Sequence, residues 1–323
     1  MRASRLIAGT LAGVTTLTLI GACGQQIAAA VEPKLELRNA VQKLADAEQA
    51  GFTLKVTGSA DDLAAALKAS GEEVSADGED RMAMDALFAS SFTISYDKAG
   101  EGTADDRGSL AATISGVTGT EIRWVDAVLY AKMPVQDVIK KVGATDADFA
   151  DLRKEVTAMP GVIDFVDGDW VKVTADQLGE FAEGGFGVPT DDLESEKLTA
   201  EVIAGATNLL EGATITRDSA DETHLIATSS TAKAYTETKR LVTAVDPGLA
   251  GDLGEAPADK PITLDLWIED GELTAAELNV LQFVDGATGR VAARLEVATG
   301  EKIEAPADAK QIDLKQFADT AGA

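Results

Sequence analysis

The sequence predicts an α+β protein built on one large antiparallel sheet, with helices gathered on one face of that sheet. Many short segments alternate apolar with polar residues, as half-buried strands do, and segments with helical three- and four-residue spacings lie between them. The strand segments follow one another through short turns. Strands joined in this way are antiparallel, because a parallel return needs a dozen or more residues of crossover. A long meander with separate helices is typical of the α+β class.

The chain begins with a segment typical of a secretory signal. Arg2 and Arg5 precede an uncharged run from Leu6 to Ala22, which is shorter than the roughly 20 apolar residues of a membrane-spanning helix. The only cysteine, Cys23, directly follows Ile20-Gly21-Ala22. This pattern matches the bacterial lipobox, in which a diacylglycerol is attached to the cysteine and cleavage occurs on its N-terminal side. The alternative is an ordinary secretory signal that happens to end at a cysteine.

We therefore expect residues 1–22 to be a lipoprotein signal peptide. Cys23 is the expected site of lipid attachment, and residues 23–33 would form a lipidated tether because they are Ala-rich and unpatterned. The mature chain would then lie on the outer face of the bacterial cell membrane, with the membrane as its partner through the anchor.

The composition is strongly acidic. The chain has 28 basic and 55 acidic residues, and removal of Arg2 and Arg5 with the signal peptide leaves a net charge of −29. Such a chain repels nucleic acid and anionic lipid headgroups, so no nucleic-acid partner is expected. With Cys23 acylated, no thiol remains for a disulfide or a thiolate metal site. The folded part must therefore depend on its hydrophobic core.

The first half of the chain alternates helical and strand patterns. Pro33 suits a helix start, and Leu37, Val41 and Leu44 then form one apolar stripe. The segments that follow are a strand at 52–56, a helix capped by Ser59 and reaching Leu67, a helix at 79–89, strands between 91 and 132, and a helical pattern at 134–158.

A hairpin is predicted around Asp167-Gly168, because this dipeptide readily adopts the positive φ angles of a type I′ turn. Its strands would be residues 163–165 and 170–173. Thr174 and Gln177 fit a capping box that opens a helix through Phe181.

The second half follows a flexible connector at 184–189. The predicted segments are a helix at 193–209, strands at 213–216 and 224–228, a helix around 241–245, and strands at 262–268 and 291–297, with a turn at Asp270-Gly271. The composition changes at 184–189 and 251–260, which fits either domain edges or loop insertions in one sheet. We prefer insertions, and predict that residues 34–323 form one domain.

The residues that catalysis would need are largely missing. His224 is the only histidine and lies in a strand pattern, so a structural role is preferred over catalysis. The sequence has no nucleophile elbow and no Walker A loop, and a single histidine excludes an HExxH zinc site. Pairs of carboxylates for glycoside chemistry are possible, but 55 acids give no way to choose one. We expect no enzymatic activity and no cofactor.

Two acidic clusters resemble calcium-binding loops only superficially. Asp146-Ala147-Asp148 and the run from Asp164 to Asp169 both lack the register of an EF-hand, so solvated surface charge is the preferred interpretation and no metal is expected. Trp124, Trp170 and Trp267 lie within or beside strand patterns, and packing on the sheet is the preferred role for each. Aliphatic residues are plentiful, and an apolar concavity between sheet and helices would suit acyl chains.

Residues 85–315 resemble the actinobacterial lipoproteins typified by LprG and LppX, which are relatives of the periplasmic lipoprotein carrier LolA. The segments that carry the resemblance are Val128–Lys132, Asp169–Val173, Asn208–Leu210, Pro261–Glu269 and Glu304–Pro306. The family implies a large antiparallel, half-open β-barrel with helices covering its concave face, enclosing an apolar cavity that carries lipids or lipoglycans.

This chain departs from the family in being longer than its usual members. Helical insertions around 60–90 and 135–158 could reshape or close the cavity. The family has no invariant catalytic residue, so only Cys23 is carried over, and the ligand-binding residues are not identified.

The preferred function is a cell-surface lipoprotein that binds or transfers lipids or lipoglycans, as a monomer. One alternative is a surface interaction or structural lipoprotein without a small ligand, which would have a filled core and an exposed apolar patch. Another is the solute-binding lipoprotein of an importer, but that class needs alternating βαβ units.

Overall fold

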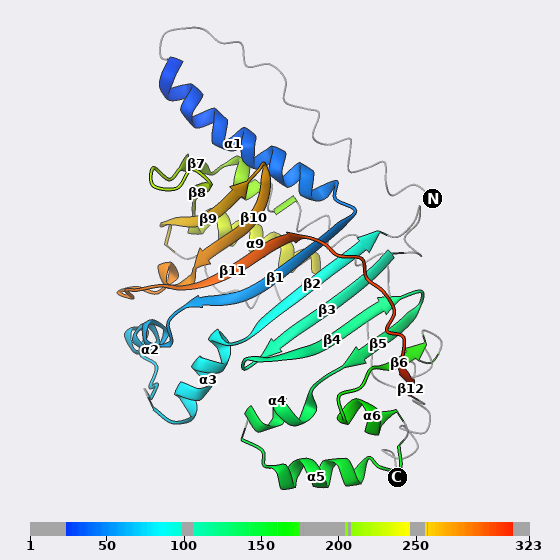
Figure 1. Ribbon diagram of the computed structural model, residues 1–323. Coiled ribbons are helices and arrows are strands. Elements are labelled where there is room, and N and C mark those ends of the chain that lie inside the picture. Colours follow the sequence, from blue (N-terminus) through cyan, green and yellow to red (C-terminus); the bar gives the residue numbers. More distant parts are fainter. Residues whose placement is uncertain are drawn as a thin grey trace.

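The computed structural model describes residues 24–75, 77–98, 106–141, 143–159, 161–174, 177, 204–205, 208–245, 256 and 258–312. Among these residues, twelve strands form one sheet in the order β12-β6-β5-β4-β3-β2-β1-β11-β10-β9-β8-β7 (Figure 1). Neighbouring strands are antiparallel, except that β12 is parallel to β6. Because β12 and β7 lie at opposite edges, the sheet is not closed. The predicted α+β class and open antiparallel sheet are confirmed.

The strands fall into two meanders that meet at β1. Their bounds are β1 Gln49–Gly58, β2 Ser91–Lys98, β3 Asp106–Ile114, β4 Val117–Val125, β5 Val128–Lys132, β6 Val171–Thr174, β7 Thr214–Arg217, β8 His224–Ser230, β9 Pro261–Glu269, β10 Glu272–Asn279, β11 Val291–Thr299 and β12 Lys310–Gln311. Strands β2 to β6 lie on one side of β1, and β11 to β7 lie on the other. The central pair therefore joins the first strand to a late one, with Ala50 opposite Thr299.

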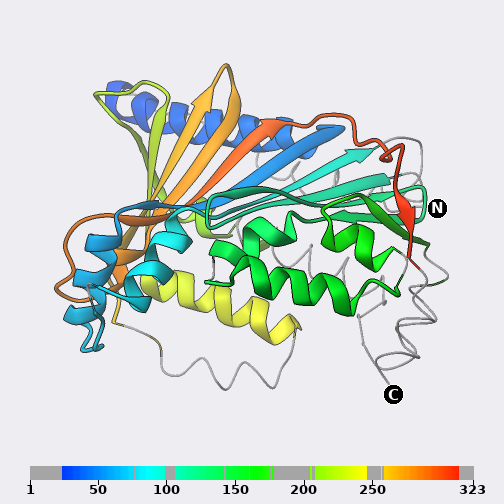
Figure 2. The ribbon, with the colours of Figure 1, turned by 60° about the horizontal axis from the view of Figure 1, so that its bottom comes forward.

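The helices lie before and between the strands. Their bounds are α1 Gly24–Ala45, α2 Ala60–Ala69, α3 Glu79–Phe88, α4 Val135–Lys141, α5 Asp146–Glu155, α6 Val162–Val166, α9 Thr231–Val245 and the 3₁₀ helix η3 Val280–Phe283. Figure 2 shows α4, α5, α6 and α9 along one side of the sheet. None of the helices among the described residues is both long and apolar enough to cross a membrane.

Successive side chains of a strand point to opposite faces, so the register assigns each residue to one of two faces. We call these the inner face and the outer face. One row of the inner face crosses seven strands and is apolar: Leu225, Leu266, Ala276, Leu295, Leu54, Phe92 and Ala112. A neighbouring row of the outer face is charged: Asp265, Glu277, Arg294 and Lys55.

A hydrophobic core anchors α1 to the inner face over β7 to β10. Leu37 and Ala40 of this helix pack in one cluster with Leu225, Leu266 and Ile268. The buried stripe of α1 is formed by Pro33, Leu37 and Ala40, whereas the predicted stripe residue Val41 is exposed.

Helix α1 also begins earlier than predicted. It starts at Gly24 and includes residues 25–32, which were expected to be unpatterned, and Pro33 lies inside it. Alanine is the strongest helix former, and residues 28–30 are all alanine, so helix propensity extends the segment beyond the proline.

The hairpin predicted at Asp167-Gly168 is wrong. Residues 162–166 form α6, and Gly168, at φ 88°, ends that helix while its N–H donates to the Phe165 carbonyl. Gly168 does adopt the predicted positive φ. It does so at the C-terminus of a helix instead of in a hairpin turn, and glycine is favoured in both places. The single helical pattern at 134–158 is likewise divided into α4 and α5.

Other elements agree with the sequence. The Ser59 hydroxyl accepts from the Asp62 N–H and caps α2, and Asp270-Gly271 forms the β9–β10 turn with φ angles of 51° and 74°. The Gln177 side chain accepts from the Thr174 N–H, as in the predicted capping box. Cys23, the helix through Phe181, the connector at 184–189 and most of the predicted helix at 193–209 lie outside the described residues.

Candidate functional site

A cavity of about 670 Å³ lies between α9 and the inner face of β8, β9 and β10. Helix α9 contributes Ala234 and Thr238 to its wall. The sheet and the segments beside it contribute mainly aliphatic side chains: Leu209, Leu210, Ala213, Ala227, Ile262, Leu264 and Leu278. This volume lies within the range of about 300–1,000 Å³ that is usual for small-ligand sites.

The cavity changes from apolar to polar along the strands. Ala227 of β8 and Leu264 of β9 lie opposite each other, and together with Leu278 of β10 they form the apolar end. Towards the end of β8 and the start of β9, the lining residues are Thr231, Lys260, Gln282 and Asp285, together with the aromatic Phe283. A cavity with this gradient matches a molecule that has one apolar and one polar part.

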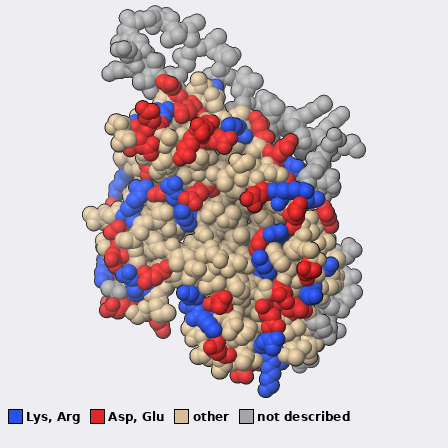
Figure 3. All heavy atoms as spheres, viewed as in Figure 1, with Lys and Arg blue, Asp and Glu red and all other residues tan. Residues whose placement is uncertain are grey.

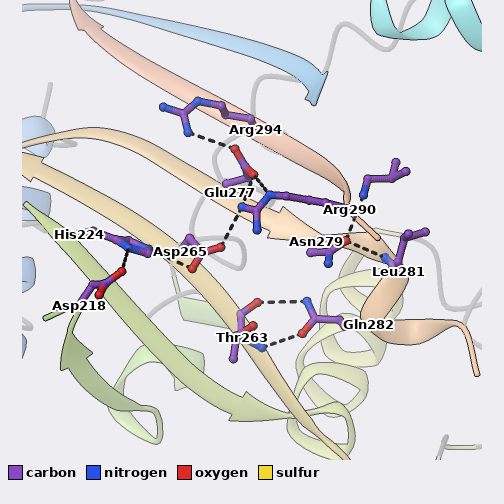
Figure 4. Close-up of polar contacts among 11 residues, drawn as sticks. Asp218, His224, Thr263, Asp265, Glu277, Asn279, Leu281, Gln282, Arg290 and Arg294 are labelled. Atoms are coloured by element: carbon purple, nitrogen blue, oxygen red, sulfur yellow. Dashed lines mark hydrogen bonds and ion pairs between the residues drawn. The ribbon is translucent and has the colours of Figure 1, made fainter. Parts of the chain in front are cut away.

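The polar end is held in place by its own hydrogen bonds. The Thr231 hydroxyl donates to the Ala258 carbonyl and accepts from the Lys260 N–H, at 2.7 and 2.9 Å. The Gln282 amide accepts from the Thr263 N–H at 2.8 Å and donates to the Thr263 carbonyl at 3.1 Å (Figure 4). Lys260 forms an ion pair with Asp285. These groups shape the polar end before any ligand is bound.

One residue that lines the cavity has a buried hydroxyl with no hydrogen-bond partner among the described residues. Ser229 lies opposite Ile262 on the inner face, and its Oγ is buried without a hydrogen bond. It stands between the apolar row at Ala227 and the polar end at Thr231. A buried hydroxyl without a partner is unfavourable.

The apolar surface of the inner face extends beyond this cavity. Phe92 and Ile94 of β2 are 51% and 56% exposed, and Leu54, Ile122 and Trp124 on neighbouring strands are exposed as well. The register places all five on the inner face. Large apolar side chains in a contiguous, exposed group mark a surface that binds something.

The outer face carries a polar network instead. Charged side chains of both signs are distributed over this side of the molecule, with α9 behind the sheet (Figures 1 and 3). At its centre, the Glu277 carboxylate accepts hydrogen bonds from Arg290 and Arg294, and Arg290 also reaches Asp265 at 3.1 Å (Figure 4). Burial tends to raise the pKa of Glu277. Hydrogen bonds and charge from the two arginines outweigh burial, so its pKa lies below its usual value.

His224 belongs to this network. Its Nδ1 lies 3.1 Å from Asp218 Oδ2 and its Nε2 lies 3.0 Å from Asp265 Oδ1, and its ring stacks on Trp267 with centroids 4.7 Å apart. The side chain is 14% exposed and lies on the face opposite the cavity. The structure thus places the lone histidine in a strand, as predicted. Both of its ring nitrogens contact aspartates, and its ring face contacts Trp267.

The acidic clusters considered for calcium have protein partners. Asp146 lies 2.6 Å from Lys140, whose hydrogen bond lowers the pKa of this aspartate, and Asp148 caps α5 through the Thr145 N–H. Asp164 accepts from the Gly161 N–H, and Asp167 pairs with Arg153. Within the described ranges, no group of three or more histidine, cysteine or acidic residues is placed to hold a metal ion.

The three tryptophans are divided between the faces. Trp124 is on the inner face, while the Trp267 ring lies under the Arg294 guanidinium at 4.5 Å on the outer face. Trp170 contacts the outer-face residues Arg123 and Lys132 at 5.0 and 4.7 Å. The sequence predicted sheet packing for all three, but not the cations that cover two of them.

Ser229 and the polar end of the cavity were not identified from the sequence. Serine is common in loops and at helix starts, and Ser229-Ser230 directly precedes α9, so the pattern alone indicates a helix cap. The one usable signal was the alternation of β8, which places position 229 on the same face as Ala227.

Comparisons with known proteins find remote structural likeness. No family model matches the chain, and no curated protein matches its sequence. The chain is similar in structure to lipoprotein LppX from Mycobacterium tuberculosis, with a TM-score of 0.32 and 12% identity over 85% of this chain and 99% of that one. It is also similar to LprF from Mycobacterium bovis, with a TM-score of 0.36 and 13% identity over 87% and 99%. Both likenesses are remote and concern the fold alone.

Proposed function

We propose that this chain is a membrane-anchored lipoprotein that holds an acyl chain of a lipid between α9 and the inner face of its sheet. The observation that carries the proposal is the cavity of about 670 Å³, which is lined by aliphatic side chains at one end and by polar groups at the other. A protein whose only task was interaction with another protein would need no such hollow.

The energetics favour an acyl chain as the occupant. Transfer of one methylene group from water to an apolar site contributes about 0.8 kcal/mol, so ten buried methylenes contribute roughly 8 kcal/mol before the costs of association. The exposed residues Phe92 and Ile94 lie on the same face and offer further apolar surface to a longer chain. The polar end of the cavity would meet the headgroup.

A variant that fills the cavity tests this proposal. Ala234 of α9 lines the cavity, so Ala234→Trp should displace the acyl chain. Thr236 of the same helix is exposed, and Thr236→Trp is the matched control. We would purify the full chain carrying Cys23→Ser from its own host without detergent and measure bound lipid by native mass spectrometry.

We expect a lipid adduct on the parent chain and on Thr236→Trp, and its loss from Ala234→Trp. An adduct that survives Ala234→Trp would move the lipid to another site. A parent chain that carries no lipid and binds no added long-chain ester would contradict the proposal and favour an interaction lipoprotein.

The proposed anchor is tested separately. If Cys23 carries the lipid, Cys23→Ala should shift the chain from the membrane fraction to the medium, and mass spectrometry of the N-terminal peptide should show a diacylglycerol only on the parent chain. An N-terminal peptide of the parent chain without a diacylglycerol would rule out Cys23 as the anchor.

A further inference from the structure

We infer that the Lys260 ammonium group binds an anionic oxygen of the bound molecule, so that the cavity selects acyl chains that end in a carboxylate or phosphate group over uncharged chains. This inference rests on the proposed function, because it assigns a chemical class to the ligand of that same cavity. Lys260 would be a binding residue that determines specificity.

The first step is the charge of the cavity wall. Among the described residues that line the cavity, Lys260 is the one basic residue and Asp285 is the one acidic residue. Their side chains form an ion pair and are 50% and 90% exposed. Because the paired groups belong to two lining residues and reach solvent, the ammonium group lies at the polar mouth of the cavity, where the headgroup of a ligand can contact it.

The second step is that the protein leaves this ammonium group partly unused. A lysine ammonium group has three N–H donors, and among the described residues only the Asp285 carboxylate accepts a hydrogen bond from it. An exposed ion pair of this kind contributes little to stability, because water screens both charges. An anionic group of a ligand can therefore bind beside the Asp285 carboxylate, or replace it, at small cost.

The third step is that the position of Lys260 is fixed. Its N–H donates to the Thr231 hydroxyl and its carbonyl accepts from the Thr231 N–H, each at 2.9 Å, so its backbone is tied to the first residue of α9. Gln282 adds a neutral donor at this end of the cavity. One N–H of its side-chain amide donates to the Thr263 carbonyl, and the other has no partner among the described residues.

The acidity of the whole chain does not cancel this local charge. At physiological ionic strength, exposed charges that lie more than about 8 Å away are largely screened. The neighbouring Asp259 is not among the residues that line the cavity, and its carboxylate accepts from the Ala232 N–H of α9 at 3.3 Å. Asp285 is therefore the carboxylate that competes with a ligand for Lys260.

The test compares ligands that have chains of equal length and different charge. Laurate, dodecyl phosphate and methyl laurate would be titrated against neutral Nile red bound to the full Cys23→Ser chain, at about pH 8, where both acids are ionised. The variants are Lys260→Gln, which removes the ammonium group, and Asp285→Asn, which removes its competitor. The control is Lys302→Gln, since Lys302 is 66% exposed, pairs with Glu304 and lies outside the cavity wall.

Lys260→Gln should weaken the binding of laurate, of dodecyl phosphate or of both by about three- to tenfold, as the loss of one charge-assisted hydrogen bond at a half-exposed site predicts. Methyl laurate should bind to this variant as it does to the parent. Asp285→Asn should tighten the binding of the same anions, and Lys302→Gln should change none of the affinities. A loss with laurate alone would identify a carboxylate as the ligand group, and a loss with dodecyl phosphate alone would identify a phosphate.

Anion affinities that are the same in the parent and in Lys260→Gln would overturn the inference. An equal loss for all three compounds, or an equal loss in Lys302→Gln, would overturn it as well, because the effect would then come from folding or from overall charge. Displacement of Nile red by methyl laurate would leave the proposed function intact in each of these cases. If none of the three compounds displaces Nile red from the parent, the proposed function fails too.

Discussion

Glu277 is held between two arginines on the outer face of the sheet. Its side chain is 6% exposed, with Arg290 Nε 2.8 Å from one carboxylate oxygen and Arg294 Nη1 3.1 Å from the other. Three strand segments meet at this carboxylate, because Arg290 directly precedes β11, Arg294 lies within it and Asp265 of β9 shares Arg290. The residue therefore stabilises the part of the sheet that forms the floor of the cavity.

We predict that Glu277→Gln lowers the free energy of unfolding by about 1–3 kcal/mol, because both arginines lose a charged partner while they keep partial access to water. Urea denaturation would measure this loss. Glu304→Gln is the control, since Glu304 and its partner Lys302 are 68% and 66% exposed and such a pair contributes little. An equal effect of the two substitutions would contradict the assigned role.

The same carboxylate predicts a pH dependence. The pKa of Glu277 is lower in the folded state, so its stabilisation is complete above the unfolded-state pKa of about 4.3 and is lost as the pH falls through the folded-state pKa. The difference in stability between parent and Glu277→Gln should therefore shrink below about pH 4. A difference that stays constant down to about pH 3 would show that the effect is not electrostatic.

At the scale of elements, Gly161 allows β12 to dock beside α6. Its φ is 81°, and a Cβ at this position would lie 2.6 Å from the Gln311 carbonyl oxygen and 2.9 Å from Ile312 Cα. Strand β12 consists of Lys310–Gln311, paired with β6 at one edge of the sheet. The glycine is thus required by both the backbone angle and the close approach of the chain.

Gly161→Ala should cost about 2–3 kcal/mol, the sum of a strained φ and a steric clash. Gly116→Ala is matched to it, because Gly116 has a φ of 82° but nothing within 4 Å of the added Cβ, so about 1 kcal/mol is expected. Denaturation together with hydrogen exchange at Ile312 would separate the two effects. Equal costs, with unchanged exchange at Ile312, would remove the proposed docking role.

The two Asp-Gly pairs show how far the elements could be predicted from the sequence. Asp270-Gly271 forms a hairpin turn and Asp167-Gly168 ends a helix, although both glycines have a positive φ. The Asp-Gly dipeptide favours a positive φ at its glycine. The residues before it determine whether a strand or a helix ends there. Val162–Val166 is short enough to be either a strand or a helix, so its packing in the folded protein determines which of the two it forms. In β9 and β11, by contrast, apolar and polar residues alternate along the sequence, and this pattern predicts a strand rather than a helix.

The sequence predicted that an apolar cavity exists, but not which residues line it. An apolar concavity was expected from the abundance of aliphatic residues, whereas its walls come from α9, β8, β9 and β10, and their assembly depends on long-range register. Only that register shows that Ser229 lines the cavity, since a serine before a helix otherwise indicates a helix cap.

At the scale of the whole molecule, charge should control the approach to membranes. The full chain has a net charge of −27. We predict that a fluorescent ester passes from the full Cys23→Ser chain more slowly to vesicles with anionic lipid than to neutral vesicles at low ionic strength. Raising the salt to about 1 M shortens the Debye length to about 3 Å and should remove the difference. Equal rates at low salt would show that charge does not control this step.

The pairing of β1 with β11 has a consequence for how the protein is made. Ala50 and Thr299 are partners although 249 positions separate them in the sequence, so the central pair of strands cannot form until nearly the whole chain has been synthesised. Until β11 is available to pair with β1, the two meanders are not joined, and their apolar sides stay exposed to solvent. Contacts between such distant residues slow folding and prolong the exposure of sticky surface. The growing chain is therefore at its most vulnerable just before its last strands are synthesised, and a chaperone that shields apolar surface would act in that interval.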